Sequence, residues 1–346
     1  MQGSHELETS TSKTGDIAVK QTCNTVCSSV SNGETSPSKL SGCLKASNLS
    51  DYCKNNSINK PYDSSLIINT SEFNEVVERL RAFFISRKFL EVSTQNRLSI
   101  LAACEDPFNV GVFNYAGSCW PLPQTGQMWL EYELLKNPEP EGYFCLTTSY
   151  RMEKNTKEGR HDLIFPLFEF EMKGGMDALI ELEKDLLTHL GYNTSRFMQE
   201  NYKTLAKEFD TTELEHEHEE RLNTERSPTF FITDFPEFTS PFWNMKRNPN
   251  DDTSYKVDVI LSGQETIGSA EREVDRDIML KRFNTIMDGG YKDKLYELFG
   301  KERTDTEMED YLNFDFFKRC GGGIGMTRLI RSMREEGLLK TKSENL

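Results

Sequence analysis

The sequence lacks any apolar run long enough to cross a membrane, and it lacks the apolar segment of a signal peptide. Residues 1–66 contain no arginine and few large apolar side chains, whereas serine, threonine and asparagine are frequent there. Such a composition cannot offset the entropy cost of ordering the chain. We therefore expect residues 1–66 to be a disordered tail. The expected location is the cytoplasm, although a Ser-rich plastid-type leader stays open.

The sequence also lacks the cysteine spacing of a zinc site and a basic stripe. Four of the eight cysteines lie in the tail at irregular intervals, and a disulfide scaffold would need a secreted context. The net charge of −15 argues against sequence-independent binding of nucleic acid, although acidic enzymes can bind RNA through local patches. With 346 residues, of which 36% are hydrophobic, the chain can bury one sizeable core but hardly two complete domains.

Cations, an aromatic ring and carboxylates gather in residues 150–171, Y-R-M-E-K-N-T-K-E-G-R-H-D-L-I-F-P-L-F-E-F-E. The alternation predicts two antiparallel strands, with Phe168 and Phe170 on one face and Glu169 and Glu171 on the other. The first strand carries Arg151, and a polar turn lies between the two strands. Arginine presents a planar fork of donors that matches phosphate oxygens, so the pattern suits a triphosphate. The alternative is a solvated, charged hairpin.

A glycine run, residues 320–325, precedes a helix that carries Arg328 and Arg331. Glycines allow a flat ligand to lie against bare backbone. The run is not a dinucleotide fingerprint, because the G-x-G-x-x-G spacing fails at Met326, and no Gly-Lys-Ser/Thr of a P-loop follows. Taken alone, such a run is more often a packing feature than a site.

Asp258 and Glu265 are candidates for a magnesium site. Their odd separation would place them on opposite sides of one regular strand, so the chain must turn or bulge at Ser262 and Gly263 if both are to bind one ion. Magnesium takes a few carboxylates together with phosphate oxygens, which fits two acids beside a triphosphate. The alternative is two exposed acids on strands.

These segments together resemble the class II aminoacyl-tRNA synthetases, in particular the aspartyl and asparaginyl enzymes, over about residues 71–333. Residues 150–171 resemble motif 2 and residues 320–330 motif 3. Three further segments fit in the same order: residues 122–134 L-P-Q-T-G-Q-M-W-L-E-Y-E-L, residues 242–245 F-W-N-M and residues 268–273 G-S-A-E-R-E. The resemblance implies an α+β fold, an antiparallel sheet flanked by helices. It also implies an AMP-forming ligase that joins an amino acid to ATP as an aminoacyl-adenylate.

The resemblance assigns roles to residues of the ATP site. Arg151 and Arg328 are the implied catalytic residues, because they offset charge on the phosphates, and Asp258 with Glu265 would hold Mg²⁺. The implied ATP ligands are Arg151, Glu153, Arg160, His161, Phe165, Gly323, Gly325 and Arg328. Glu153 would read the adenine amino group and Phe165 would stack on the ring. Ile164 stands where the family usually has a glutamate, which leaves one polar contact unfilled.

The resemblance also indicates the amino-acid substrate. The implied substrate-binding residues are Gln127, Leu130, Glu131, Glu271 and Arg272. Aspartate enzymes carry a lysine near the position of Leu130 or Glu131, and a carboxylate without that cation forgoes a charged hydrogen bond of about 1.5–3 kcal/mol. The expected substrate is therefore asparagine or a close analogue. Glu271 replaces the usual glutamine, and it could bind the substrate amino group or indicate a nonstandard substrate.

The expected organisation is a tail over residues 1–66 and a catalytic domain over residues 67–346, with a charged helical insertion at about residues 178–226. Apolar side chains at helical spacing predict a helix that begins at about Ser71, with Ser71 as its N-cap. In the insertion, one apolar stripe is expected from Leu179, Leu182, Leu186, Leu187 and Leu190. The insertion carries His216 and His218 among acids, which we interpret as a solvated helix face and not as a metal site. Residues 88–95, K-F-L-E-V-S-T-Q, resemble motif 1, which builds the family's dimer interface. Gln95 replaces the motif's proline, yet a homodimer is still expected.

Three functions remain open because the sequence does not identify what attacks the adenylate. Transfer to a tRNA end is supported by the asparaginyl-like segment but opposed by the lack of strands for an anticodon-binding barrel before residue 67. An ammonia-dependent asparagine synthetase fits a bare catalytic core but is weakened by Leu130. A non-catalytic relative that binds ATP or a partner is opposed by the retention of Arg151, Glu153, Asp258, Glu265 and Arg328.

Overall fold

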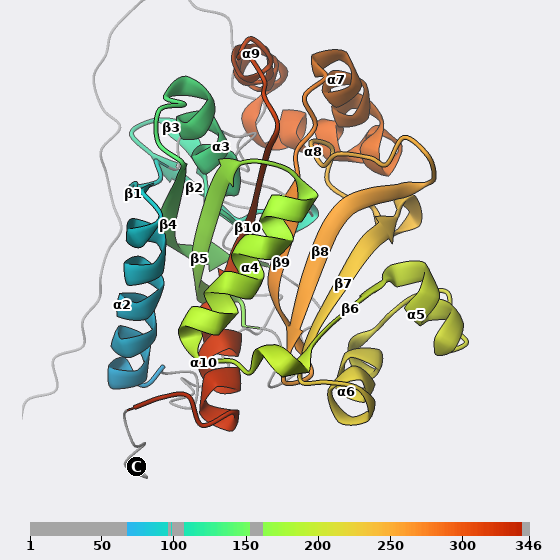
Figure 1. Ribbon diagram of the computed structural model, residues 1–346. Helices are drawn as coiled ribbons and strands as arrows, with labels where there is room; N and C mark the ends of the chain where they lie inside the picture. Colours follow the sequence, from blue (N-terminus) through green and yellow to red (C-terminus); the bar gives the residue numbers. More distant parts are fainter. Residues whose placement is uncertain (1–67, 96–97, 99–106, 153–161, 341–346) are drawn as a thin grey trace, which may run out of the picture. The chain divides into compact units, whose positions relative to one another are not determined.

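An eight-stranded sheet with the order β1-β4-β5-β10-β9-β8-β7-β6 organises the described part of the chain (Figure 1). The structure is a computed structural model that describes residues 68–95, 98, 107–152 and 162–340. All of these belong to the second of two compact units, residues 42–346. Neighbouring strands run antiparallel except at the edges, where β1 pairs with β4 and β6 pairs with β7 in parallel. The sheet and its flanking helices confirm the predicted α+β class.

The strands of this sheet are β1 (Phe89–Glu91), β4 (Gly142–Tyr150), β5 (Ile164–Lys173), β6 (Phe197–Asn201), β7 (Thr229–Pro236), β8 (Thr253–Leu261), β9 (Gln264–Glu271) and β10 (Arg319–Gly325). A separate hairpin is formed by β2 (Val112–Tyr115) and β3 (Ser118–Pro121). The helices are α2 (Thr70–Ser86), α3 (Gln127–Lys136), α4 (Met176–Leu190), α5 (Tyr202–Glu208), α6 (His216–Glu225), α7 (Arg276–Thr285), α8 (Gly290–Phe299), α9 (Lys301–Leu312) and α10 (Met326–Glu335). No described helix is both long and apolar enough to span a bilayer.

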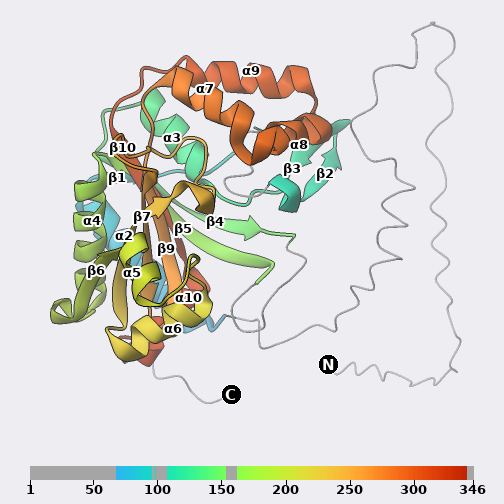
Figure 2. The same cartoon turned by 90° about the vertical axis from the view of Figure 1, so that its right-hand side faces the viewer.

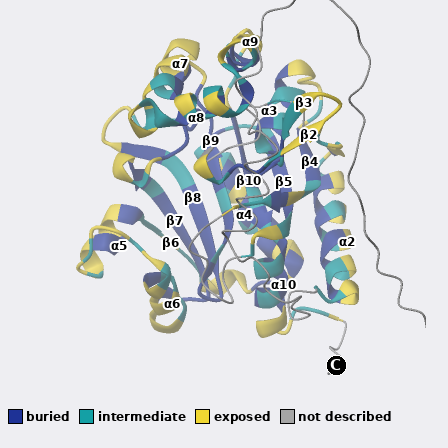
Figure 3. Cartoon of the chain, turned by 180° about the vertical axis from the view of Figure 1, so that it is seen from behind, coloured by how far each residue is buried: buried dark blue, intermediate teal, exposed yellow. Residues whose placement is uncertain are grey.

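Helices α2, α4 and α10 cover one face of the sheet and share its main core with β5, β8, β9 and β10 (Figures 1 and 3). The predicted apolar stripe of α4 is confirmed, because Leu179, Leu182, Leu186, Leu187 and Leu190 are buried there. Side chains alternate across a strand, so residues of opposite parity lie on the other face. We call that other face the site face.

Strand β5 shows the predicted alternation. Phe168 and Phe170 lie in the helix-covered core, and Glu169 and Glu171 lie on the site face. The antiparallel pairing of β4 with β5 confirms the predicted hairpin. Arg151 directly follows β4 instead of lying within it, and its N–H donates to the carbonyl oxygen of Leu163 at 2.8 Å.

Two details of the sequence interpretation were wrong. Helix α2 is capped by Asn69 and not by Ser71, since the Asn69 side-chain oxygen accepts the N–H groups of Ser71 and Glu72. The stretch of residues 178–226 is not wholly helical, because it contains strand β6, which pairs in parallel with β7. Pairing with a neighbouring strand outweighs local preference there. The predicted tail, residues 1–66, lies outside the described residues.

The acidic helix α6 is also less solvated than the sequence suggested. His218 is buried, and its Nδ1 accepts the N–H of Glu215 at 2.9 Å, which caps the first turn. Helices α7, α8 and α9 gather beside α3 at one end of the sheet (Figure 2) and share a second core with it. This second core supplies Tyr311 to the site described next, and Asn244 lies between two of its members, Trp243 and Met245.

Candidate active site

The glycines of β10 form the centre of the site face. Gly323 pairs with Glu169 of β5, and a Cβ on Gly323 would lie 3.4 Å from Nε2 of Gln127 and 3.6 Å from Cγ of Glu169. A Cβ on Gly325 would lie 3.8 Å from Cδ of Arg328. The structure therefore brings Gln127, Gly323, Gly325 and Arg328 to one region, as the sequence predicted.

A hairpin turn places Asp258 and Glu265 on adjacent strands. Ser262 and Gly263 both have positive φ, 49° and 78°, which suits the two central positions of a type I′ turn between β8 and β9. The predicted chain reversal at these residues is confirmed. The register also shifts between Val259 and Ile260, which is a bulge.

The two acids reach a common point above Gly268. A Cβ built on Gly268 would lie 3.1 Å from Oε1 of Glu265 and 3.6 Å from Oδ1 of Asp258. Arg328 lies beside them, since its Nη1 donates to the Glu265 carbonyl at 2.6 Å and lies 4.0 Å from Glu265 Oε2. No group of three or more acidic, histidine or cysteine ligands occurs among the described residues. Two carboxylates fit a magnesium ion that takes its other ligands from phosphate oxygens and water.

Arg151 and Phe165 lie together at the end of the β4–β5 hairpin where β4 ends and β5 begins. The Arg151 guanidinium carbon is 5.5 Å from the centroid of the Phe165 ring, which is a cation–π distance. Both side chains are half-buried. Three predicted ATP ligands, Glu153, Arg160 and His161, lie outside the described residues.

Glu169 is a buried acid that the sequence interpretation did not assign to the site. Its carboxylate accepts the Gly126 N–H at 2.8 Å, the Thr147 hydroxyl at 2.6 Å and the Thr125 hydroxyl. Burial raises the pKa of Glu169, while these donors and the charge of Arg151 oppose the shift. The carboxylate thus anchors the N-terminus of α3, which carries Gln127.

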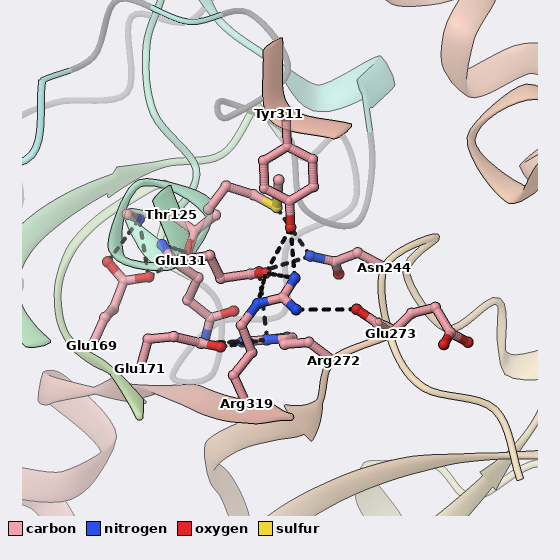
Figure 4. A network of polar contacts seen from close by, with 12 residues as sticks. Thr125, Glu131, Glu169, Glu171, Asn244, Arg272, Glu273, Tyr311 and Arg319 are labelled. Atoms are coloured by element: carbon pink, nitrogen blue, oxygen red, sulfur yellow. Dashed lines mark hydrogen bonds and ion pairs between the residues drawn. The ribbon is translucent and has the colours of Figure 1, made fainter. Parts of the chain in front are cut away.

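Arg272 lies in a fully buried group of charges (Figure 4). Its Nη2 and Nε donate to Glu171 at 3.0 and 3.2 Å, and Nε lies 3.5 Å from Glu131 Oε1. Arg319 donates to Glu131 Oε2 through Nη2 and Nε at 2.7 and 3.0 Å. Burial raises the pKa of Glu171 to about 7, and the charge of Arg272 opposes the shift.

Two predicted substrate residues occupy other surroundings. Leu130 packs in an apolar cluster with Leu134, Tyr143 and Cys145. Glu271 points to the helix-covered face, where its carboxylate accepts the N–H of Met176 at 2.9 Å and caps α4. The structure therefore separates Glu271 from Arg272, Gln127 and Glu131.

Sequence reasoning missed Glu169, Glu171, Arg319, Tyr311 and Asn244 as parts of the site. A signal existed for the two acids, because they alternate with phenylalanines along β5 and the opposite face had to receive them. Arg319 directly precedes the glycine run, but nothing in its local sequence indicates burial. Tyr311 and Asn244 come from distant segments that only the fold brings together.

A family model and a relative with a known name match much of this chain. The family model described as tRNA synthetases class II (D, K and N) matches residues 60–340. An aspartate–tRNA(Asp) ligase of Thermoplasma volcanium is 24% identical over 250 residues, which are 64% of this chain and 57% of that protein.

Solved structures resemble the fold. The asparaginyl-tRNA synthetase of Pyrococcus horikoshii, complexed with asparaginyl-adenylate, matches with a TM-score of 0.63 and 19% identity over 76% of this chain and 64% of that chain. A putative aspartyl-tRNA synthetase of Leishmania major Friedlin matches with a TM-score of 0.60 and 15% identity over 75% and 61% of the two chains. This chain thus spans less than two thirds of these relatives. With the family model matched over residues 60–340, the chain belongs to the class II tRNA synthetases of the D, K and N group.

Proposed function

We propose that the chain activates asparagine, or a close analogue, with ATP to form an aminoacyl-adenylate and pyrophosphate. The observation that carries the proposal is the convergence of Gln127, Gly323, Arg328 and the pair Asp258 and Glu265 on the site face. In this reaction the substrate carboxylate attacks the α-phosphorus, and the bond to pyrophosphate breaks. The protein has to hold two anions together and balance their charge.

The described cations are suited to that task. Arg151 would lie between the α-phosphate and the substrate carboxylate, because it is anchored at the hairpin end and can donate two hydrogen bonds to an anion. Phe165, next to Arg151, would stack on the adenine, with Glu153, Arg160 and His161 as further proposed ligands. Arg328 would cover the outer phosphates from the far side of the glycine strand.

Asp258 and Glu265, beside Arg328, would hold Mg²⁺. When bound, the ion would neutralise charge on the departing pyrophosphate. Two cations lie beside these acids. Lys256 Nζ is 3.1 Å from Asp258 Oδ2, so the acid pair has a cation on each side, Lys256 and Arg328. These cations keep two neighbouring carboxylates compatible with an anionic substrate.

The buried charges favour an amide side chain over a carboxylate. Arg272 and Glu171 form a pair that offers one donor group and one acceptor group at the same place. A side-chain amide has a matching acceptor and donor, whereas a carboxylate would meet Glu171 with like charge. Leu130 carries no charge and packs in an apolar cluster, so this position provides no second cation for a substrate carboxylate. Gln127 would contact the substrate backbone.

Transfer of the activated amino acid to a tRNA end is the proposed second step, as the relatives' names suggest for those proteins. The chain covers 57% of the length of the Thermoplasma volcanium ligase and 64% of the Pyrococcus horikoshii chain. Because it spans only part of these relatives, the tRNA acceptor is proposed together with the activation step. We also propose a homodimer through the region that resembles motif 1. Leu90 in this region and Ile85 at the end of α2 are 52% and 58% exposed, which leaves apolar surface for a second copy.

Exchange of labelled pyrophosphate into ATP, with each amino acid in turn, tests the proposal. Exchange with asparagine supports it, and subsequent charging of tRNA identifies the acceptor. Exchange with aspartate, together with ammonia-dependent release of AMP, would instead indicate an asparagine synthetase. Silence with every amino acid would refute activation and leave a non-catalytic relative.

A further inference from the structure

Four buried charged residues form one connected group, which we call the charge cluster: Glu131, Glu171, Arg272 and Arg319 (Figure 4). Each is at most 2% exposed. The cluster contains two carboxylates and two guanidinium groups, so its formal charges cancel. Buried charges of this kind are tolerated only when they are paired and hydrogen-bonded.

Glu131 lies between the two arginines. Its Oε2 accepts two hydrogen bonds from Arg319 and one from the Tyr311 hydroxyl at 2.8 Å, and its Oε1 accepts the Asn244 amide at 2.7 Å. Arg319 is fixed in turn by the Glu273 carbonyl at 3.1 Å and by the Phe316 ring, whose centroid is 5.0 Å away. These contacts hold the Glu131 carboxylate in place.

Because Arg319 pairs with Glu131, Arg272 pairs mainly with Glu171. The Arg272 guanidinium nitrogens lie 3.0 to 3.3 Å from the Glu171 oxygens, whereas Nε lies 3.5 Å from Glu131 Oε1. Without Arg319, Glu131 would be a buried carboxylate that lacks its main cation. Arg272 is the next guanidinium within reach, so it would shift toward Glu131 and away from Glu171.

We propose that Arg319 is a positioning residue that sets side-chain specificity, because by neutralising Glu131 it keeps Arg272 paired with Glu171. The site then presents a neutral donor and acceptor pair, which takes an uncharged amide and rejects a carboxylate. This inference rests on the proposed function and deepens it. Arg319 itself contacts no ligand group in this scheme and acts through Glu131 and Arg272.

The pKa of Glu171 depends on the charges of Arg272, Glu131 and Arg319 around it. The groups that face it are Arg272, which directly follows β9, Glu131 of α3, and Arg319 and Cys320 of β10. Removal of the Arg319 charge raises the pKa of Glu171 above about 7, because one cation that stabilises the carboxylate is lost. Removal of the Glu131 charge lowers the pKa, because one like charge is lost.

The test compares R319M, E131Q and the double variant with the wild type. The carboxyl ¹³C titration of glutamate-labelled protein, with the Glu171 signal assigned by E171Q, reads the charge coupling without any activity. We expect the midpoint to move up in R319M, to move down in E131Q and to return to the wild-type value in the double variant. R282M is the matched control, since Arg282 pairs with Glu273 and not with a member of the charge cluster. The Glu171 midpoint should not change in this variant.

Pyrophosphate exchange on the same proteins reads specificity. E131Q leaves one surplus cation, so the ratio of kcat/KM for asparagine to that for aspartate should fall about ten- to a hundredfold. R319M should raise KM for asparagine more than it lowers kcat, and the pH profile of kcat/KM should shift with the titration midpoint. E131Q keeps the test valid if R319M fails to fold.

The outcomes separate the two proposals. An active wild type whose variants keep the Glu171 midpoint and the asparagine preference would overturn the inference alone. A double variant that fails to restore the midpoint would do the same. A wild type that is silent with every amino acid refutes the proposed function and, with it, the specificity role of Arg319.

Discussion

Glu183 offers a test of how the core of this fold responds to pH. The residue lies on α4 among the leucines of the main core and is fully buried. Burial raises its pKa from 4.5 to about 8, and the Asp258 carboxylate adds to the shift. A group whose folded-state pKa is raised stabilises the fold below its unfolded pKa, and this contribution is lost as the pH rises through the folded pKa. We therefore expect Glu183 to lower stability progressively between pH 4.5 and about 8.

Glu183→Gln removes this titration while it preserves shape. Each pH unit in that interval corresponds to about 1.4 kcal/mol for one proton, so the variant should be more stable than the wild type by about 4–5 kcal/mol near pH 8 and nearly equal near pH 4.5. Glu169 and Glu171 titrate in the same direction, but they are present in both proteins and cancel in the difference.

Urea unfolding from pH 4.5 to 8.5 measures this difference. Glu181→Gln is the matched control, because Glu181 is exposed on the same helix and its replacement should leave the pH dependence unchanged. Parallel curves for Glu183→Gln and the wild type, or a variant that is less stable at pH 8, would show that the buried carboxyl is not the group that titrates.

Three further predictions concern the site. Arg151→Ala should reduce pyrophosphate exchange by about a hundredfold or more while the circular dichroism spectrum stays unchanged; retained exchange would mean that the site is misplaced. Asp258→Asn should raise the Mg²⁺ concentration that gives half-maximal exchange, and an unaltered Mg²⁺ titration would exclude the acid pair as the metal site. Gly323→Ala should keep the melting temperature but raise KM for ATP, because its Cβ meets only ordinary contacts and stands on the site face. Gly321→Ala, in contrast, should cost about 1–3 kcal/mol of stability, since its Cβ would collide with Glu171; equal melting temperatures for the two variants would contradict the close approach.

The local parts of the fold followed from the sequence because their patterns are short-range. Alternation predicted β5 and its two faces, helical spacing predicted α2 and α4, and Ser262 with Gly263 predicted the turn between β8 and β9. Strand β6 was missed because only its pairing with β7 makes it a strand. The N-cap of α2 was displaced by two residues, since Asn69 and Ser71 are both good caps and geometry decided between them.

The site was predictable where a single segment carried its chemistry. Arg151, Phe165, Gly323 and Arg328 each belong to a recognisable run, and their roles stay predictions. The charge cluster was not predictable in the same way, because its pairing depends on contacts between α3, β5, β10 and the residue that follows β9. Glu271 shows the limit most clearly: it adjoins Arg272 in sequence, yet strand parity turns it to the other face.

The order of the strands has a consequence for synthesis of the protein. Strand β10 is the last strand of the described chain, yet it lies between β5 and β9 in the middle of the sheet. Until residues Arg319–Gly325 leave the ribosome, the strands on either side of β10 form two separate half-sheets. The edges of β5 and β9 that face β10 then have unpaired backbone N–H and C=O groups. A ribosome stalled before that point would release a polypeptide prone to aggregation, and chaperone binding to such truncated products should cease once β10 is included.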